Sequence, residues 1–326
     1  MKTLVIDGGT TNLRVFLLDA SGEMLSSARA EGGVRHTALD GHNGRLRKLL
    51  HDCIERVLAE TGTSVPEIGR CIAYGMITSS MGLLEIPHLA APASAEALHE
   101  GMRRASFPDV APFEIEFIPG VRNFAGAVDT GNCSGMDMMR GEETESVGLY
   151  RLLAPEGDAL FVLPGSHNKF VHMGAGGEIL GCMTSISGEL LDSVTHHTIL
   201  ADAVKGSFCS AETYDAGMAK AGALECLRSG LGRASFAGRI LNTLGHEDAA
   251  KIQSWLLGAV LCEDARALRA FVKDAAPVVY VAGKPPLQQA FIDVLDVLGL
   301  PGAHPVAPDI TARMGIAGAL AIAELS

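Results

Sequence analysis

The order of hydrophobic and polar positions repeats about half a chain apart. Residues 3–25 and residues 159–180 each begin with a short apolar run, pass through a polar turn that contains glycine, and continue into a second apolar run and a second glycine-rich turn. Apolar runs separated by such turns are typical of β-hairpins. This internal repeat predicts two related halves that each start with consecutive hairpins. A chance likeness between two unrelated hairpins is the alternative.

Helical patterns and further strands follow each predicted hairpin pair. Apolar residues recur at helical spacing in 44–60, and 137–150 is also predicted to be a helix. Apolar runs that end in a Gly, Ser or Pro turn predict strands within 70–80, 114–119 and 277–283. The second half adds predicted helices at 187–203, 211–230, 232–245, 248–271, 286–298 and 309–325. Hairpins mixed with alternating strands and helices indicate two α/β halves, each a mixed sheet covered by helices.

The composition restricts the partners and the location of the protein. The chain has 326 residues, 48% of them hydrophobic, which is enough for two cores of ordinary domain size. A net charge of −12 without a block of Lys or Arg argues against nucleic acid or an anionic membrane as partner. No apolar stretch reaches the roughly 18–20 residues of a membrane helix, and the first residues are typical of a strand and not of a signal peptide. Seven dispersed cysteines are typical of reduced thiols, so we expect a cytoplasmic location.

The first predicted hairpin has the sequence DGGTTN (7–12) at its tip. Glycines let the backbone approach a phosphate closely, and successive N–H groups together with two hydroxyls can surround its oxygens. Asp7, at the end of the strand, is a candidate ligand of Mg²⁺, because this cation prefers carboxylate oxygen. For this motif taken alone, a tight turn capped by an Asp is the alternative.

The second predicted hairpin has GSHN (165–168) at the corresponding place, and a basic residue follows in each copy, Arg14 and Lys169. Two phosphate-binding hairpins would form a clamp for a polyphosphate. Since the chain has no GxxxxGK[ST] motif, any kinase activity would depend on these hairpins. Gly283 ends a predicted strand where an adenine–ribose pocket is expected, and an ordinary turn is the alternative there.

A third cluster contains Asp137 and Arg140. On a helix these two side chains would share one face, because they are three residues apart. A guanidinium keeps a neighbouring carboxylate ionised and oriented, which suits a general base for a sugar hydroxyl. A solvated, charged helix face is the alternative.

Four segments in this order resemble the 2-dehydro-3-deoxygalactonokinases, a family of the sugar kinase, Hsp70 and actin superfamily. They are DGGTTNLR (7–14), RGEET (140–144), PGSHNKF (164–170) and SGEL (187–190), and the likeness extends to AYGMITSS (73–80), IPGV (118–121) and VAG followed by QQAF (281–291). RGEET followed by the PGSHNK segment is the specific part of this pattern, whereas DGGTT alone indicates only the superfamily.

The resemblance implies an α/β fold of two duplicated actin-like ATPase domains, of the ribonuclease H-like type, with a hinged cleft. It places a sugar-acid domain at 1–150 and an adenosine domain at 151–326. It implies transfer of the γ-phosphate of ATP, with Mg²⁺, to the C6 hydroxyl of 2-dehydro-3-deoxy-D-galactonate in galactonate catabolism.

The resemblance also implies roles for individual residues. Phosphate and ATP binding would fall to Asp7, Gly9, Thr10, Thr11, Gly165, Ser166, His167, Lys169 and Gly283, with Mg²⁺ near Asp7. Sugar-acid binding would fall to Asn12, Arg14, Gly75, Ser79, Glu142 and Glu143. Asp137 would be the general base, assisted by Arg140.

Several alternatives stay open at this stage. The glycine-rich segment between Val121 and Arg140 is longer than the family pattern leads us to expect, which could move the base to Asp129 or alter the acceptor pocket. A kinase of a related acceptor, such as 2-keto-3-deoxygluconate or a hexose, would share the same phosphate residues. An actin-like ATPase without a sugar acceptor is a further alternative. The sequence does not give the oligomeric state, and a homodimer is among the options.

Overall fold

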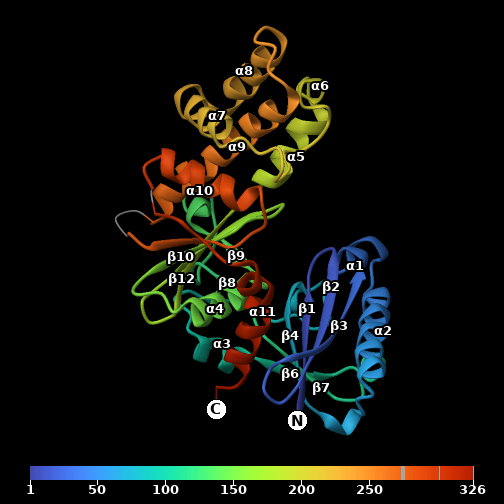
Figure 1. The fold of residues 1–326 in the computed structure, drawn as a ribbon. Coiled ribbons are helices and arrows are strands. Elements are labelled where there is room, and N and C mark those ends of the chain that lie inside the picture. Colours follow the sequence, from blue (N-terminus) through green and yellow to red (C-terminus); the bar gives the residue numbers. More distant parts are fainter. Residues whose placement is uncertain (273–275, 301, 326) are drawn as a thin grey trace. The chain divides into compact units, whose positions relative to one another are not determined.

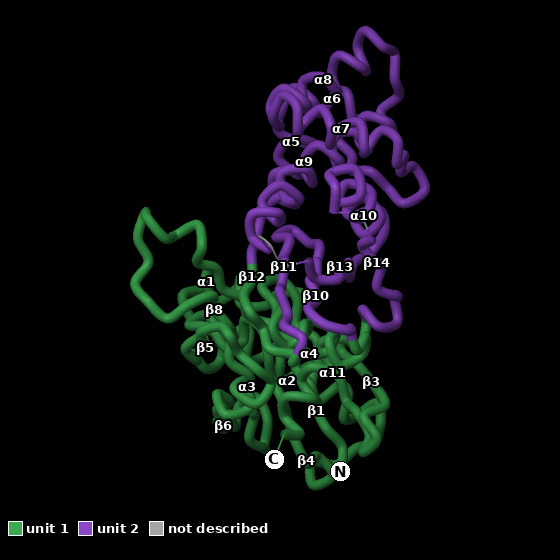
Figure 2. The backbone as a smooth tube through the Cα atoms, turned by 90° about the vertical axis from the view of Figure 1, so that its left-hand side faces the viewer, with its two compact units in different colours: residues 1–154, 176–182, 312–326 green, residues 155–175, 183–311 purple. Residues whose placement is uncertain are grey.

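The computed structural model describes residues 1–272, 276–300 and 302–325 (Figure 1). The chain forms two compact units (Figure 2). Unit 1 consists of residues 1–154, 176–182 and 312–326, and unit 2 of residues 155–175 and 183–311. The expected functional division into 1–150 and 151–326 stays a prediction.

Unit 1 contains a sheet with the strand order β3-β2-β1-β4-β7-β6. Its strands are β1 (Lys2–Gly8), β2 (Asn12–Leu18), β3 (Met24–Glu31), β4 (Ile68–Gly75), β6 (Arg103–Ser106) and β7 (Glu114–Phe117). The first three strands form consecutive antiparallel hairpins, and β1 also pairs with β4 in parallel. The tip of the first hairpin therefore lies at the same edge of the sheet as the carboxyl end of β4.

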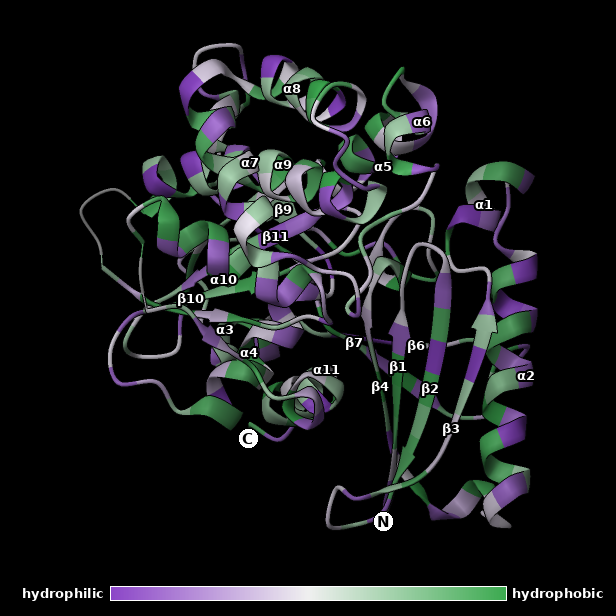
Figure 3. Ribbon diagram, turned by 45° about the horizontal axis from the view of Figure 1, so that its top comes forward, coloured by the Kyte–Doolittle hydropathy of each residue, from purple (hydrophilic) through white to green (hydrophobic). Residues whose placement is uncertain are grey.

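Helix α2 (Gly44–Thr61) packs on β2 and β3 through one apolar side. Green and purple positions alternate around this helix in Figure 3, as the helical period requires. The buried residues of α2 are Leu46, Leu50, Cys53, Ile54, Val57 and Leu58, and they join the core of unit 1 with the inward residues of β1, β2 and β7. Burying this stripe fixes the hairpins against a rigid element.

The rest of unit 1 consists of short strands and helices. A three-stranded sheet has the order β5-β8-β9, with β5 (Leu89–Ala90), β8 (Val121–Arg122) and β9 (Met138–Met139). The helices are α1 (Arg35–Asp40), α3 (Ala95–Gly101) and α4 (Glu142–Leu153), with 3-10 turns at Val65–Glu67, Met76–Thr78 and Cys133–Gly135. The last helix, α11 (Pro308–Ala323), continues from unit 2 into unit 1.

Helices α4 and α11 approach each other closely through glycines. A Cβ added to Gly148 would lie 1.8 Å from the carbonyl oxygen of Met314, and one added to Gly318 would lie 1.8 Å from that of Thr144. The end of α11 is held as well, since Arg70 Nη1 donates a hydrogen bond of 2.5 Å to the carbonyl of Ala323. Residues 312–323 are therefore part of the packing of unit 1.

A second sheet has the order β12-β11-β10-β13-β14, and all of its strands belong to unit 2 except for residues 179–182 of β12, which are counted with unit 1. Its strands are β10 (Ala159–Leu163), β11 (Asn168–Met173), β12 (Ile179–Ser185), β13 (Val278–Val281) and β14 (His304–Pro305). The helices of unit 2 are α5 (Ser187–His197), α6 (Ala201–Val204), α7 (Ala216–Ser229), α8 (Leu231–Thr243), α9 (Ala249–Val272) and α10 (Leu287–Val297). Helix α9 packs against α5, α7, α8 and α10 and supplies much of the core of unit 2.

The two sheets begin with the same arrangement. In each, an antiparallel hairpin (β1–β2 or β10–β11) is followed by a third strand beside the second one, and the first strand pairs in parallel with a later strand (β4 or β13). The prediction of two related α/β halves from the repeated pattern is therefore confirmed.

The prediction of a helix over 137–150 is wrong at its start. Helix α4 begins only at Glu142, because Met138 and Met139 form strand β9 and pair with Arg122 and Val121 of β8. The predicted helix 187–203 is also interrupted, since α5 ends at His197 and α6 begins at Ala201. Among the described residues, no helix combines the length and apolarity needed to cross a bilayer.

Candidate functional site

The turn between β1 and β2 has its carbonyl groups occupied. The carbonyls of Gly9, Thr10 and Thr11 each accept a hydrogen bond from a backbone N–H of the segment 32–35, at 2.8–3.2 Å. The N–H of Gly9 donates to the carbonyl of Asn12. The N–H groups of Thr10 and Thr11 have no acceptor in the part of the chain that the structure describes, and both residues are exposed. The turn therefore presents donors, which suits an anion.

The turn between β10 and β11 has a similar hydrogen-bond pattern. The carbonyl of Ser166 accepts from the N–H of Glu189 at 3.2 Å, and the N–H of Gly165 donates to Oδ1 of Asn168 at 2.9 Å. Within the described ranges, the N–H groups of Ser166 and His167 have no acceptor. Nε2 of His167 lies 2.8 Å from Oε1 of Glu189. Thus both halves carry a turn with two free backbone donors.

A glycine from a later segment packs directly on each turn. A Cβ on Gly33 would lie 1.8 Å from the carbonyl oxygen of Gly9, and a Cβ on Gly188 would lie 2.4 Å from that of Gly165. Gly9 and Gly165 were matched in the repeated pattern, so Gly33 and Gly188 are equivalent in space. No side chain fits at either place without moving the turn. The sequence pattern did not reveal Gly33, because its partner is distant along the chain.

Carboxylates gather beside the first turn. Asp7 lies opposite Arg14 in the hairpin, and Arg14 Nη1 donates to Asp7 Oδ2 at 3.0 Å. Burial raises the pKa of Asp7 in spite of Arg14, and Glu142 adds to the increase. Burial, followed by the charges of Asp7 and Glu142, also raises the pKa of Glu145 well above its ordinary value. A single guanidinium does not neutralise this group of acids.

Three backbone segments converge at the carboxyl ends of β1 and β4. A Cβ on Gly75 would lie 2.9 Å from the carbonyl oxygen of Gly8, and a Cβ on Gly141 would lie 3.4 Å from Cα of Gly75. Gly75 has a φ of 89° and Gly141 a φ of 115°, values that side chains disfavour. This close approach places Glu142, the first residue of α4, next to the first hairpin.

Glu143 is fully buried, in contrast to its neighbour Glu142. Both of its carboxylate oxygens accept from the N–H of Gly141 at 2.8 Å. Burial, and then the charge of Glu142, raise the pKa of Glu143 to about 8. Glu143 thus fixes the turn that precedes α4, whereas its predicted contact with substrate stays a prediction.

Arg140 and Ser79 are engaged with the segment 76–88. Arg140 Nη1 donates to the carbonyl and to Oγ1 of Thr78 at 2.7 and 2.8 Å, and Nη2 donates to the carbonyl of Ile86 at 2.5 Å. Ser79 is buried and donates to the carbonyl of Met76 at 2.7 Å. Arg140 therefore shapes this segment, and its predicted catalytic role stays a prediction.

Asp137 and Arg140 do not share a helix face. Asp137 precedes β9, where its Oδ1 accepts from the N–H of Met138 at 2.7 Å and its carbonyl accepts from the N–H of Asn123 at 2.9 Å. Asp129 lies in an exposed loop and caps it, because its Oδ1 accepts from the N–H of Gly131 at 2.8 Å. The helical geometry that linked Asp137 to Arg140 is wrong, while the choice between these acids as base is untested.

A cavity of about 420 Å³ lies within unit 2, next to the second turn. Gly165, Ser166, Asn168, Ser187 and Gly188 form its polar part, and Leu191, Phe208, Cys209, Leu257, Val260, Leu261, Pro286 and Leu287 form its apolar part. Gly283 lies just before Pro286, and its own Cβ position is 3.0 Å from Cγ of Pro164. An apolar chamber with donors at one end is typical of a nucleoside site.

A buried acid supports the second turn. Asp264 of α9 accepts from Ser187 Oγ at 2.6 Å and from Asn168 Nδ2 at 2.7 Å. Burial raises the pKa of Asp264, although these hydrogen bonds oppose the increase. Lys169 is also buried, and its Nζ donates to Oγ1 of Thr184. The sequence analysis missed Asp264, for which the only signal is an acid within the apolar pattern of 249–272.

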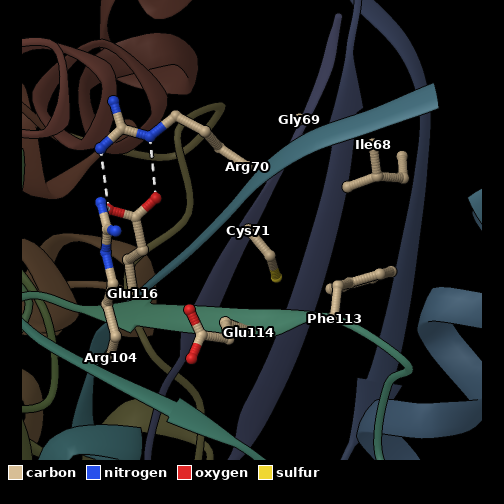
Figure 4. A pocket seen from close by; sticks show the side chains of 8 residues that line it. All are labelled: Ile68, Gly69, Arg70, Cys71, Arg104, Phe113, Glu114 and Glu116. Carbon is tan, nitrogen blue, oxygen red and sulfur yellow. Dashed lines mark hydrogen bonds and ion pairs between the residues drawn. The ribbon is translucent and has the colours of Figure 1, made fainter. Parts of the chain in front are cut away.

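A second cavity, of about 410 Å³, lies at the opposite edge of the sheet of unit 1, where β4 and β7 begin. Arg70 and Arg104 both point to Glu116 there (Figure 4). Arg70 donates two hydrogen bonds of 2.8 Å to this carboxylate, and Arg104 donates one of 3.3 Å. The arginines in this cavity are therefore paired.

In unit 1, the structure brings together Asp7, the turn 9–11, Arg14, Gly75, Arg140 and Glu142 at the carboxyl ends of β1 and β4. Asn12 is part of this edge too, and its Oδ1 accepts from Arg29 at 2.7 Å. In unit 2, Gly165 and Ser166 line the cavity, and His167 follows them in the same turn.

Comparison with known proteins gives a family match along nearly the whole chain. The model of the 2-keto-3-deoxy-galactonokinase family matches residues 7–319. A probable 2-dehydro-3-deoxygalactonokinase of Rhizobium meliloti (strain 1021) is 29% identical over 221 residues. That alignment covers 66% of this chain and 61% of the relative, so it spans less than two thirds of that protein.

A solved structure is similar over the whole length. The crystal structure of a Sinorhizobium meliloti protein provisionally named a 2-dehydro-3-deoxygalactonokinase has a TM-score of 0.76 and is 25% identical. The match covers 98% of this chain and 98% of that one. This likeness agrees with the duplicated two-domain α/β fold.

Proposed function

Because the chain belongs to the 2-keto-3-deoxy-galactonokinase family, we propose that it transfers the γ-phosphate of ATP to the C6 hydroxyl of 2-dehydro-3-deoxy-D-galactonate. The family match over residues 7–319 is the observation that carries the proposal. The two turns with free backbone donors support it, because phosphoryl transfer depends mainly on positioning and on neutralising phosphate charge. A cytoplasmic location and a homodimer stay predictions of the sequence.

The second turn and its cavity bind the nucleotide in this proposal. The free N–H groups of Ser166 and His167 donate to phosphate oxygens, and the apolar walls from α9 and from Pro286 and Leu287 receive the adenine ring. In this proposal Gly283 also contributes to nucleotide binding.

Mg²⁺ fits the acids of unit 1. The charge of Glu142 helps to raise the pKa of Asp7, and the charges of Asp7 and Glu142 help to raise that of Glu145, so a divalent cation near Asp7 would relieve this repulsion. No group of three His, Cys, Asp or Glu side chains arranged for metal binding occurs among the described residues. Asp7 would therefore share the ion with phosphate oxygens and water, as is usual for Mg²⁺. When bound, the ion would neutralise developing charge on the phosphates.

A carboxylate accepts the proton of the C6 hydroxyl in this mechanism. Asp137 is the base proposed from the sequence, and Glu142 is a second candidate, because it is partly exposed at the start of α4 and its charge acts on Asp7. Loss of the base should lower kcat by roughly 10²–10⁴-fold. Comparing Asp137→Asn, Glu142→Gln and Asp129→Asn assigns the role, and near-normal kcat in a variant removes that residue from it.

A coupled assay of ADP release with Mg²⁺ and ATP tests the function directly. The panel contains 2-dehydro-3-deoxygalactonate, its gluconate epimer, galactonate, glucose and glycerol. We expect selective turnover of the first compound. If only another acceptor is turned over, the proposed substrate is wrong. ADP release that no acceptor stimulates would refute the kinase proposal.

A further inference from the structure

Arg122 is a cation without a partner in the described part of the chain. Its side chain is partly buried, and its Nε is buried with no acceptor among those residues. Across residues 1–272, 276–300 and 302–325, its guanidinium forms no ion pair and no hydrogen bond. Native proteins rarely leave a buried donor unsatisfied unless a ligand or water completes it.

The backbone around Arg122 is held firmly, so this side chain starts from a fixed position. Strand β8 pairs Arg122 with Ala90 of β5 and with Met138 of β9. The next residue, Asn123, donates from Nδ2 to the carbonyls of Gly135 and Cys182 at 3.0 and 2.8 Å. Its Oδ1 accepts from the N–H of Cys182 at 2.7 Å. Rigid support of this kind is what a binding residue needs.

His88 and Arg140 lie near Arg122. Burial first, and then the charges of Arg140 and Arg122, lower the pKa of His88 to about 4. The carboxylates of Glu143 and Glu85 act on the guanidinium of Arg140. Arg140 differs from Arg122, since its guanidinium is already engaged with carbonyls of Thr78 and Ile86.

Close contacts connect this region to the phosphate end of unit 1. A Cβ on Gly120, the residue before β8, would lie 2.8 Å from both Cγ of Arg140 and Cδ2 of His88. Arg140 in turn holds the segment that follows Gly75, and Gly75 packs on Gly8 at the first hairpin. Strand β8, which carries Arg122, is thus connected through Gly120 and Arg140 to the segment that follows Gly75.

We propose that Arg122 binds the carboxylate of the sugar-acid substrate and selects acids over neutral sugars. A guanidinium recognises a carboxylate through two parallel hydrogen bonds, which the two Nη groups of Arg122 can supply. Nδ1 of His88 lies 3.4 Å from Nη2 of Arg140. Arg14, the arginine that the sequence analysis assigns to sugar-acid binding, already has Asp7 as partner. The inference rests on the proposed function and names the residue that recognises the substrate carboxylate.

Steady-state kinetics of Arg122→Gln and Arg122→Lys test this inference. Each protein is assayed with 2-dehydro-3-deoxygalactonate and with its neutral C1 methyl ester. We expect Arg122→Gln to lower kcat/KM for the acid by roughly 10- to 100-fold, mainly through KM, because a hydrogen bond to a charged group is lost. The ester and ATP should keep their kinetic constants. The kcat/KM of Arg122→Lys for the acid should lie between those of the wild type and Arg122→Gln. Lysine keeps the positive charge but cannot form the two parallel hydrogen bonds.

Arg104→Gln is the matched control, because this arginine lies in unit 1 but at the opposite edge of its sheet, paired with Glu116. It should leave both substrates unaffected. An unchanged KM for the acid in Arg122→Gln, or equal losses with acid and ester, would overturn the inference.

Calorimetric titration with 2-dehydro-3-deoxygalactonate in the absence of ATP separates the inference from the function. Binding that is lost in Arg122→Gln supports the inference even if no acceptor is phosphorylated, an outcome that would overturn the kinase proposal alone. Turnover of the acid with full binding in Arg122→Gln would overturn the inference alone. Thermal unfolding checks that the variants are folded. If Arg122→Gln does not fold, the binding and kinetic measurements are made with Arg122→Lys.

Discussion

The two hairpin turns have the same backbone arrangement and different charges around it. Both present two N–H groups that have no acceptor among the described residues, and both are covered by a glycine from a later segment. The first turn follows Asp7 and lies beside further acids, whereas Leu163 stands at the corresponding place before the second turn. The second turn instead adjoins a cavity with apolar walls. The two turns thus share a backbone arrangement, and in the proposed mechanism their side chains divide the work between metal binding and nucleotide binding.

The largest effect should come from filling the space at the covering glycines. Gly33→Ala and Gly188→Ala would each place a methyl group within 2.4 Å of a turn carbonyl, so the turn must move. We expect losses of about 1–3 kcal/mol in unfolding free energy, as in overpacked sites, and a large drop in kcat/KM. Denaturant unfolding and ADP release measure both.

Gly232→Ala is the control for these variants, because no atom lies within 4 Å of its Cβ position. If the backbone comparison holds, both hairpin variants lose activity while the control does not. Full activity in Gly188→Ala or Gly33→Ala would show that the free donors of that turn do not bind phosphate.

The next largest effect should distinguish the charges of the two turns. Asp7→Asn keeps the shape of the side chain and removes a charge from the first turn only. We expect kcat to fall on the order of 10²-fold, with a weaker dependence on Mg²⁺ and little change in the affinity for ATP in the absence of metal. Titration of kcat with Mg²⁺ measures this. Asp52→Asn, an exposed change on α2, should behave as the wild type, and an unchanged Mg²⁺ dependence in Asp7→Asn would contradict the role of Asp7.

A smaller effect should appear in the dependence of stability on pH. The pKa of Glu143 is raised from 4.5 to about 8, so the folded state holds a proton that the unfolded state has released. The stability contributed by this group is present at low pH and is lost as pH rises from about 4.5 to about 8. Glu143→Gln should therefore lose less unfolding free energy than the wild type over this range. The control Glu55→Gln should not differ from wild type, and equal slopes for all three proteins would refute the assignment.

The smallest effect should come from the support of the second turn. Ser187→Ala removes the donor that lies 2.6 Å from Oδ1 of Asp264, and Asn168 remains as a partner. We expect a loss of about 1 kcal/mol in stability and a small rise in KM for ATP, with KM for the sugar acid unchanged. Ser229→Ala on the exposed side of α7 is the control. A change in KM for the sugar acid alone would break the proposed division between the two turns.

Local patterns predicted the hairpins and the family, and distant contacts explain the failures. The repeated glycine turns act within a few residues, so 3–25 and 159–180 were predicted correctly, and the resemblance is confirmed by the match over 7–319. Met138 and Met139 form a strand because β8 is available as a partner, and the helical pattern could not include this pairing.

Several functional features could not be read from the sequence for the same reason. Gly33 is required by the carbonyl of Gly9, and Asp264 by Asn168 and Ser187. Arg122 is partly buried and, unlike Arg70 and Arg140, has no partner for its guanidinium among the described residues. Each of these facts depends on which segments meet in space.

The close packing of α4 on α11 has a consequence for protein synthesis. Residues 312–323, which cover Gly148 and accept the hydrogen bond from Arg70, are translated only after all of unit 2. The long stretch 183–311 of unit 2 is complete by then, and the ribosome adds about 5–20 residues per second. Until residues 312–323 are synthesised, the side of α4 that they cover stays exposed in the nascent chain. The unit that begins first is the one that finishes last, and a chaperone has its opportunity to act in that interval.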